Sequence, residues 1–203
     1  MIKIVYFDFD GVLTLEGHAC HEICGYLEPI AKIPADKIEP VFHNVAKQLL
    51  TNGKRYQDYV DAMNNELGTK LTAQDILNAV EKSKLNEKTI DVIHILKDNQ
   101  IRVGILTDNN IERLEMIRRH PDFSFLSLII GSSEVGCTKD NCQNIFEEAL
   151  KQAKVKPEEV LFIDNNEKCL EIPKKMGFIT YWHDESKNNV EDLKRFLHNY
   201  NLL

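Results

Sequence analysis

The chain has 203 residues, of which 43% are hydrophobic, and a formal net charge of −7. That length allows one full hydrophobic core with a smaller appended lobe, so we expect one or two domains. Acidic and basic residues are interspersed, and no run of lysines and arginines would follow a phosphate backbone, which argues against a nucleic-acid partner. No apolar run approaches the ~20 residues that span a bilayer, and the first residues are unlike a signal peptide. We therefore expect a soluble, cytoplasmic protein with no membrane partner.

The cysteines indicate a reducing compartment, because there are five of them without regular spacing, as expected of reduced thiols. Cys137 and Cys142 flank a loop, and we regard both as incidental. Another group near the start of the chain has a composition that is also found in zinc sites. No second ligand pair follows it at zinc-finger spacing, and Cys20 and Cys24 fit the inner face of a helix, so we favour a structural role. The members of this group are His18, Cys20, His21 and Cys24.

The most informative stretch is 2–14, which reads IKIVYFDFDGVLT. Its β-branched and aromatic residues predict a strand buried on both faces of a parallel sheet. Asp8 and Asp10 interrupt the apolar run and point to one side of it, where two carboxylates need a compensating charge such as a bound cation. Gly11 lets the backbone turn, which places both acids at the carboxyl end of the strand, where open α/β sheets build their sites. The alternative is that the two acids only cap the next element or pair with lysines.

Residues 16–85 show helical periodicity and contain no credible strand. Apolar residues recur at four-residue spacing, as Val41, Val45 and Leu49 do. Thr72 and Asp75 have the spacing of a capping box that begins a further helix. The segment is therefore predicted to be a small helical bundle inserted after the first strand, either as a plain structural insertion or as a lid.

From residue 86 onward, helices and strands alternate. Strands are predicted at 101–106, 128–130, 160–163 and 178–182, each followed by a helical pattern. This strict succession predicts a parallel sheet with right-handed crossovers. Pro173 falls inside one of the helices and should kink it.

Three polar residues follow the later strands: Thr107, Lys139 and Asp164. The carboxyl ends of parallel strands meet at the same edge of a sheet, so we expect these groups to converge with Asp8 and Asp10. Taken singly each is a weak indication, because a threonine at a strand end is usually a turn residue and a loop lysine is usually solvated. Their common placement at strand ends indicates a single site.

The four segments DFDGVLT, ILTDNN, SSEVGCTKDN and VLFIDNN resemble the motifs of the haloacid dehalogenase superfamily, the Mg²⁺-dependent phosphatases and phosphotransferases with an aspartate nucleophile. The resemblance covers residues 1–14 and about 86–184. With the strand pattern, it leads us to expect an α/β fold with a doubly wound parallel sheet in the order 3-2-1-4-5. Residues 1–15 and 86–203 would form the catalytic core, and 16–85 a helical cap domain.

The resemblance also implies roles for the motif residues. Asp8 would be the nucleophile that forms an aspartyl-phosphate. Asp10 would protonate the leaving oxygen and then activate the water that hydrolyses the intermediate. Thr107, with backbone amides near Asp108, would hold the phosphoryl oxygens, and Lys139 would neutralise their charge.

Mg²⁺ is the implied cofactor, bound by the Asp8 carboxylate, the Asp10 carbonyl and Asp164. The chain departs from the usual family pattern at two positions. Asp140 stands where a proline is common, which we interpret as neutral for catalysis. Asn165 stands where a second acid is common, so one negative charge beside the metal is missing and we expect weakened Mg²⁺ binding.

The predicted function is a Mg²⁺-dependent phosphatase for a small phosphorylated metabolite, acting as a monomer or weak homo-oligomer. Asp10 favours phosphoryl transfer over dehalogenation, because a halide leaves without a proton. A sugar-phosphate mutase with the same aspartates remains an alternative, as does a regulatory protein on a decayed enzyme scaffold, supported by Asn165 alone. Candidate specificity residues, polar or aromatic groups near predicted loops of the cap, are Glu16, His18, His43, Lys54, Arg55 and Tyr56.

Overall fold

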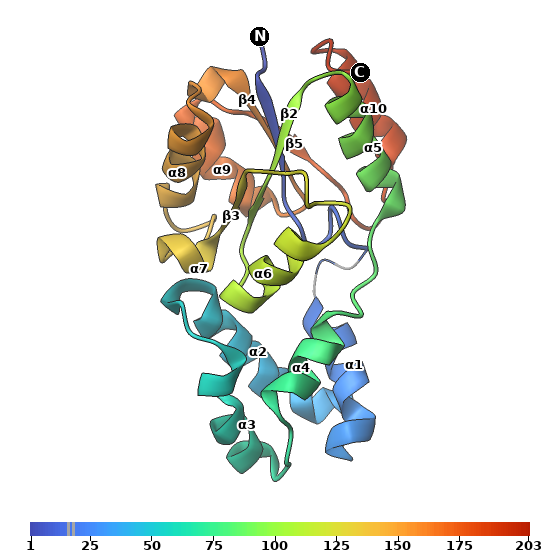
Figure 1. Cartoon of the computed structure of the whole chain (residues 1–203), viewed down its shortest axis with the longest axis vertical. Coiled ribbons are helices and arrows are strands. Elements are labelled where there is room, and N and C mark those ends of the chain that lie inside the picture. The colour runs from blue at the N-terminus through green and yellow to red at the C-terminus, as the bar shows by residue number, and fades with distance from the viewer. Residues whose placement is uncertain (16, 18) are drawn as a thin grey trace.

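The computed structural model describes residues 1–15, 17 and 19–203, and it contains a five-stranded parallel sheet in the order β3-β2-β1-β4-β5 (Figure 1). The predicted fold class and strand order are confirmed. The central strand is buried along its whole length, which explains its continuous run of apolar residues. The strands are β1 (Ile4–Phe7), β2 (Arg102–Thr107), β3 (Ile129–Gly131), β4 (Val160–Asp164) and β5 (Ile179–Trp182).

Helices cover both faces of the sheet, as a doubly wound fold requires. Val5 and Phe7 of β1 pack with α5 (Glu87–Asp98), α6 (Ile111–Arg119) and α10 (Val190–His198). Ile4 and Tyr6 point to the other face and pack with α8 (Asn144–Ala153) and α9 (Glu167–Met176). Pro173 lies inside α9, as predicted. Two short helices complete the core: α7 (Ser132–Val135) and η2 (Pro157–Glu159).

A second hydrophobic cluster is formed by the helices between β1 and α5, beyond the carboxyl ends of the strands (Figure 1). Leu27, Phe42 and Leu49 are among its buried residues. Thr72 and Asp75 form the predicted capping box, with Asp75 N–H donating to Thr72 Oγ1 at 3.1 Å and Thr72 N–H donating to Asp75 Oδ2 at 2.8 Å. We call this unit the cap; it comprises α1 (Ala19–Ala31), α2 (Ala35–Asn52), η1 (Tyr56–Asp58), α3 (Val60–Leu67) and α4 (Ala73–Val80).

The chain enters and leaves the cap through two adjacent segments. Thr14 and Leu85 form an antiparallel bridge. Leu15 N–H donates to the Lys84 carbonyl at 3.0 Å, and Asn86 N–H donates to the Leu13 carbonyl at 2.8 Å. The cap is therefore joined to the core by a pair of hydrogen-bonded connections.

Two of the predicted cap residues, Glu16 and His18, lie outside the described residues. His18 also belongs to the group of histidines and cysteines that was compared with zinc sites. Of the other members of that group, His21 contacts Glu39 at the surface, and Cys24 is buried in the cap cluster. Within the described parts of the chain, no helix is both long and apolar enough to cross a bilayer.

A first prediction concerns Gly104, in the middle of β2. A Cβ at this position would meet the Tyr6 ring and lie 2.7 Å from the Leu128 carbonyl oxygen, which is backbone and has little freedom to move. Gly104→Ala should therefore lower the free energy of unfolding by about 1–3 kcal/mol in urea denaturation. The control is Gly25→Ala in α1, where nothing lies within 4 Å of the added Cβ, and it should gain up to ~1 kcal/mol. Equal losses in both variants would contradict this account.

Candidate active site

The predicted strand-end residues meet in one place. Phe7 of β1 is in register with Ile105 of β2 and Ile163 of β4, so the three strands end side by side. Asp8 follows β1, and the last residues of the neighbouring strands are Thr107 and Asp164; all three side chains are buried. The register of the sheet thus brings these three predicted residues together.

The centre of this site is the ammonium group of Lys139, which is buried between two carboxylates. Its Nζ lies 2.7 Å from Asp8 Oδ1 and 2.7 Å from Asp164 Oδ2. Burial alone would lower the pKa of Lys139, but Asp164, Asp8 and Asp108 raise it well above its ordinary value. Burial raises the pKa of the Asp8 carboxyl, and the adjacent ammonium opposes that rise. Lys139 is therefore a permanent positive charge beside the predicted nucleophile.

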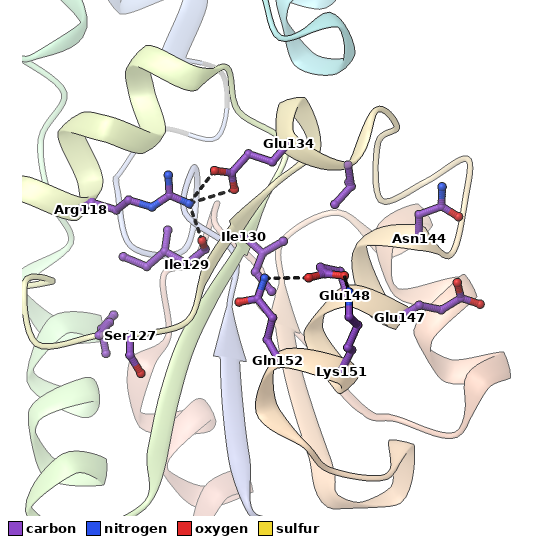
Figure 2. A pocket seen from close by; sticks show the side chains of 12 residues that line it. Arg118, Ser127, Ile129, Ile130, Glu134, Asn144, Glu147, Glu148, Lys151 and Gln152 are labelled. Carbon is purple, nitrogen blue, oxygen red and sulfur yellow. Dashed lines mark hydrogen bonds and ion pairs between the residues drawn. The ribbon is translucent and has the colours of Figure 1, made fainter.

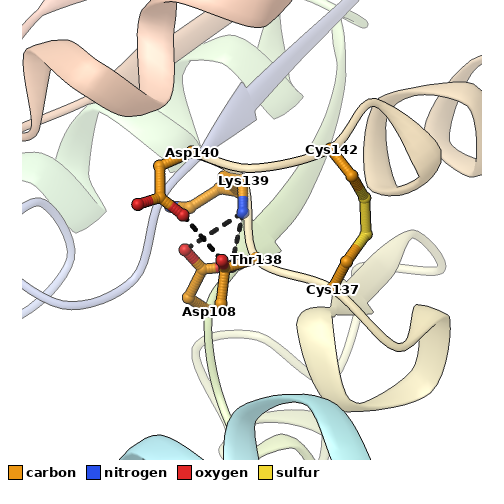
Figure 3. The surroundings of a disulfide bond; sticks show 6 residues. All are labelled: Asp108, Cys137, Thr138, Lys139, Asp140 and Cys142. Atoms are coloured by element: carbon orange, nitrogen blue, oxygen red, sulfur yellow. Dashed lines mark hydrogen bonds between the residues drawn. A yellow bond between two sulfur atoms is a disulfide. The ribbon is translucent and has the colours of Figure 1, made fainter.

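The loop that carries Lys139 is fixed from two sides (Figure 3). The Asp108 carboxylate accepts hydrogen bonds from the Lys139 backbone N–H at 3.0 and 3.3 Å. A disulfide between Cys137 and Cys142 closes the loop across it. The side chain of Asp108 therefore positions the lysine loop, a contact that the sequence analysis did not predict.

This disulfide corrects the expectation that all cysteines are reduced. The sequence analysis regarded Cys137 and Cys142 as incidental, because their spacing alone gives no reason to pair them. In the structure the loop folds back on itself and brings their Cα atoms to 6.2 Å, which is within the range that a disulfide bridges. The free cysteines are Cys20, Cys24 and Cys169.

Both carboxylate oxygens of Asp10 are held by residues that follow β2. Asn109 Nδ2 donates to Oδ2 at 2.8 Å, and Arg113 Nη2 lies 3.1 Å from Oδ1. The same Asn109 nitrogen is 2.8 Å from Thr107 Oγ1. Neither partner is among the residues predicted from the sequence. Asn109 lies inside the ILTDNN segment and Arg113 in the helix that follows it, but the helical pattern of Leu114 and Ile117 gave no reason to bury the arginine.

Asn165, which replaces the usual second acid, has the carboxylate of Glu185 beside it. Asn165 Nδ2 donates to Glu185 Oε2 at 2.7 Å, and the Trp182 indole N–H donates to the Asn165 carbonyl at 2.8 Å. Glu185 belongs to the segment after β5, and it lines a cavity of about 580 Å³ together with Asp8. Gly11 lies against this pair: its φ is +78°, and a Cβ there would meet both Asn165 and Glu185. Glu185 is not among the residues predicted from the sequence.

The donor atoms at this site suit a hard divalent cation. Two buried carboxyl groups share one ammonium here, and burial raises the pKa of Asp8 well above its ordinary value, so a bound cation would stabilise its ionised form. Neither Asp8 Oδ2 nor the Asp10 carbonyl oxygen accepts a hydrogen bond from any residue that the structure describes. No group of three or more His, Cys, Asp and Glu side chains in the described ranges could hold a metal. The oxygen atoms that a metal could use here are those of the Asp8 and Asp164 carboxylates and the Asp10 carbonyl, and oxygen ligands of this kind fit Mg²⁺.

A cavity of about 600 Å³ lies between the cap and the core. Asp10 and Asn110 line it from the core, and His43 and Tyr56 line it from the cap. The other described candidates for specificity, Lys54 and Arg55, do not line it. Arg55 pairs with Glu115 of α6, and Lys54 lies over the ring of Tyr59.

A larger cavity, of about 880 Å³, lies beside the outer edge of β3 and is lined by none of the predicted catalytic, phosphate-binding or metal-binding residues (Figure 2). Arg118 Nη2 donates to the Ile129 carbonyl at 2.7 Å and also pairs with Glu134. These contacts satisfy backbone on the exposed edge of the sheet, which explains the polar lining as protection of an edge strand. We assign the chemistry to the strand ends and not to this cavity.

The comparison with protein families agrees with this geometry. The family model described as haloacid dehalogenase-like hydrolase matches residues 2–176. The chain belongs to the haloacid dehalogenase-like hydrolases. It is therefore a member of a hydrolase family, and its four motifs occupy the strand ends described above. No curated protein matches the chain in sequence.

Solved structures share the fold of this haloacid dehalogenase-like hydrolase. A predicted HAD-like family hydrolase from Porphyromonas gingivalis is 23% identical, with a TM-score of 0.73 over 97% of this chain and 98% of that chain. A HAD family enzyme from Bacteroides thetaiotaomicron in complex with magnesium and inorganic phosphate is 18% identical, with a TM-score of 0.70 over 91% and 96% of the two chains. A HAD phosphatase from Thermococcus onnurineus is 17% identical, with a TM-score of 0.62 over 91% and 86%.

A second prediction concerns pH and Asp108. Burial raises the pKa of Asp108 to about 6, against the opposing effect of Lys139, from an ordinary value of 3.8. The folded state thus holds this proton more tightly than the unfolded state, so the contribution of Asp108 to stability falls as the pH rises from about 4 to about 6. Asp108→Asn does not titrate. Urea denaturation at pH 4.5 and pH 7 should show the parent losing stability relative to the variant as the pH rises, and a difference independent of pH would refute the assignment.

Proposed function

We propose that the protein is a Mg²⁺-dependent phosphatase that hydrolyses a small phosphorylated metabolite through an aspartyl-phosphate on Asp8. The observation that carries the proposal is the buried contact of Lys139 Nζ with Asp8, at 2.7 Å, beside Thr107 at the strand ends. Phosphoryl transfer asks a protein mainly for positioning and for positive charge, and this arrangement offers both. The related structures that contain magnesium and inorganic phosphate, and the related phosphatase, support the same chemistry.

The first half of the proposed reaction phosphorylates Asp8. A carboxylate oxygen attacks phosphorus, the bond to the leaving oxygen breaks with its electron pair, and Asp10 gives that oxygen a proton. In the second half, Asp10 takes a proton from a water whose oxygen attacks phosphorus. The bond to Asp8 then breaks, and inorganic phosphate is released.

The phosphoryl oxygens would be bound by Thr107 and Lys139. Thr107 Oγ1 already accepts from Asn109 Nδ2 at 2.8 Å, so its own O–H proton is free to be donated to a phosphoryl oxygen. Lys139 supplies a fixed positive charge on the side of Asp8 and Asp164. Mg²⁺, held by Asp8, the Asp10 carbonyl and Asp164, would add positive charge at the phosphoryl group and keep Asp8 ionised.

The cavity of about 600 Å³ between cap and core fits a small metabolite. We assign the selection of the leaving group to the cap, because His43, Lys47 and Tyr56 of the cap line this cavity together with Asp10, whereas Asp8 and Lys139 line the cavity of about 580 Å³ that also contains Asp10. Glu185 supplies a carboxylate beside Asn165, which supports an active enzyme over the alternative of a decayed scaffold.

A third prediction tests the nucleophile. Asp8→Asn keeps the shape of the side chain but removes the attacking charge, so release of phosphate from a panel of phosphate esters should fall by at least 10³-fold, on the order expected for removing a catalytic nucleophile. Beryllium fluoride should inhibit the parent by imitating the phosphoaspartate. The control is Asp91→Asn on the exposed side of α5, which should retain full activity. Substantial turnover in Asp8→Asn would exclude the proposed mechanism.

A fourth prediction concerns the metal and can be read without turnover. If the Glu185 carboxylate binds a metal water, Glu185→Gln should raise the dissociation constant for Mg²⁺ in calorimetry by about 10-fold. Asn165→Asp should lower it severalfold, because a second carboxylate would then face the metal. The matched control is Glu171→Gln, on the exposed face of α9. Identical binding curves for all four proteins would show that neither position senses the metal.

A further inference from the structure

Arg113 is a buried charge that the proposed reaction does not use. It lies in the first turn of α6, and 6% of its side chain is exposed. One guanidinium nitrogen, Nη1, donates to the carbonyl of Val80, the last residue of α4 in the cap, at 2.7 Å. The other, Nη2, lies 3.1 Å from Asp10 Oδ1. A single side chain of the core thus touches both the cap and the proposed acid.

The two contacts of Arg113, with Val80 and with Asp10, are geometrically coupled. A guanidinium group is planar, so the directions of its two terminal nitrogens are fixed relative to each other. The Arg113 group also lies over the ring of Phe9, at 5.1 Å from the centroid. A buried arginine is costly unless it is paired and hydrogen-bonded, so the positions of Val80 and Asp10 are both constrained by the need to satisfy it.

The rest of α6 also contacts the cap, but without reaching Asp10. Glu112 Oε2 accepts from the Tyr56 backbone N–H at 2.8 Å, and Glu115 pairs with Arg55. Met116 packs against the cap cluster. Among these described contacts of α6 with the cap, Arg113 is the one that continues to the site.

We propose that Arg113 is a positioning residue that couples docking of the cap to the alignment of Asp10. With the cap docked, Val80 holds Nη1 and thereby aims Nη2 at Asp10, whose other oxygen is held by Asn109. When the cap moves away, the guanidinium loses its partner in the cap and Asp10 loses its fixed orientation. The catalytic consequence rests on the proposed function, because it takes Asp10 as the acid for the leaving oxygen.

The coupling must be reciprocal. If docking of the cap stabilises the contact between Arg113 and Asp10, then that contact stabilises docking by the same factor. This allows a test without substrate. The Tyr56 amide is a suitable reporter, because its N–H donates to Glu112 across the junction of cap and core and not to Arg113.

The first experiment measures hydrogen exchange of the Tyr56 amide by NMR. Arg113→Met and Asp10→Asn should each speed the exchange at least fivefold, the lower end of typical coupling between sites, and the double variant should exchange no faster than the faster single variant. The control is Arg118→Met on the same helix, whose partners are Ile129 and Glu134 of the core. Parent-like exchange in Asp10→Asn, or equal acceleration by Arg118→Met, would overturn the coupling.

The second experiment compares kcat/KM for an alkyl phosphate and for 4-nitrophenyl phosphate, whose leaving group departs without a proton. Arg113→Met should lower the ratio of alkyl to aryl kcat/KM by about 100-fold, on the scale of general acid catalysis, and Arg113→Lys should recover part of it. Arg118→Met, whose partners Ile129 and Glu134 lie in the core, should leave the ratio unchanged.

Two other results are decisive. Equal losses on both esters in Arg113→Met would show that Arg113 is only structural, which overturns its role in positioning Asp10. If the parent releases no phosphate from any ester, the proposed function is wrong, and the Tyr56 exchange still decides whether Arg113 links the cap to Asp10.

Discussion

The site depends on one ammonium group buried between two carboxylates. Removing ions from water costs on the order of several kcal/mol per ion, and the attraction offsets that cost only when the geometry is tightly held. The sheet fixes the carboxylates, since Asp8 and Asp164 stand at the ends of adjacent strands in register. The lysine is fixed by the Asp108 contact and by the closed loop around it. The rigid core is thus a precondition for placing Lys139 at 2.7 Å from both acids.

Much of this arrangement could be predicted from the sequence, because it follows from local pattern and strand order. The alternation of strands and helices indicates the sheet, and parallel strands bring Asp8, Thr107 and Asp164 to one edge. The partners of Asp10 could not be predicted in the same way. Arg113 lies 103 residues away along the chain, and its burial depends on the position of the cap, which helical periodicity does not encode.

Glu185 and the disulfide could not be predicted for the same reason, because both depend on tertiary contacts that local periodicity does not encode. The sequence indicated a missing charge at Asn165, but the segment after β5 that returns a carboxylate to this place has no strand or helix pattern to locate it. Cys137 and Cys142 are near each other only because the loop folds back around Lys139. Local periodicity together with the family resemblance therefore predicted the scaffold and the motif residues, and the contacts made by irregular segments required the tertiary structure.

The paired connections at Thr14 and Leu85 have a consequence for the design of the fold as a whole. Because the chain leaves and re-enters the core at neighbouring points, hydrogen bonds between the two connections hold the ends of the 70-residue inserted segment together. Contacts within the inserted segment are not needed for this. Inserts of different size and shape can be accommodated at such a point at little entropic cost, since closing a longer loop adds only about 0.6 kcal/mol per doubling of its length. The sheet therefore does not depend on the particular content of the segment between Thr14 and Leu85, which can vary in length and structure while the strand ends stay in place.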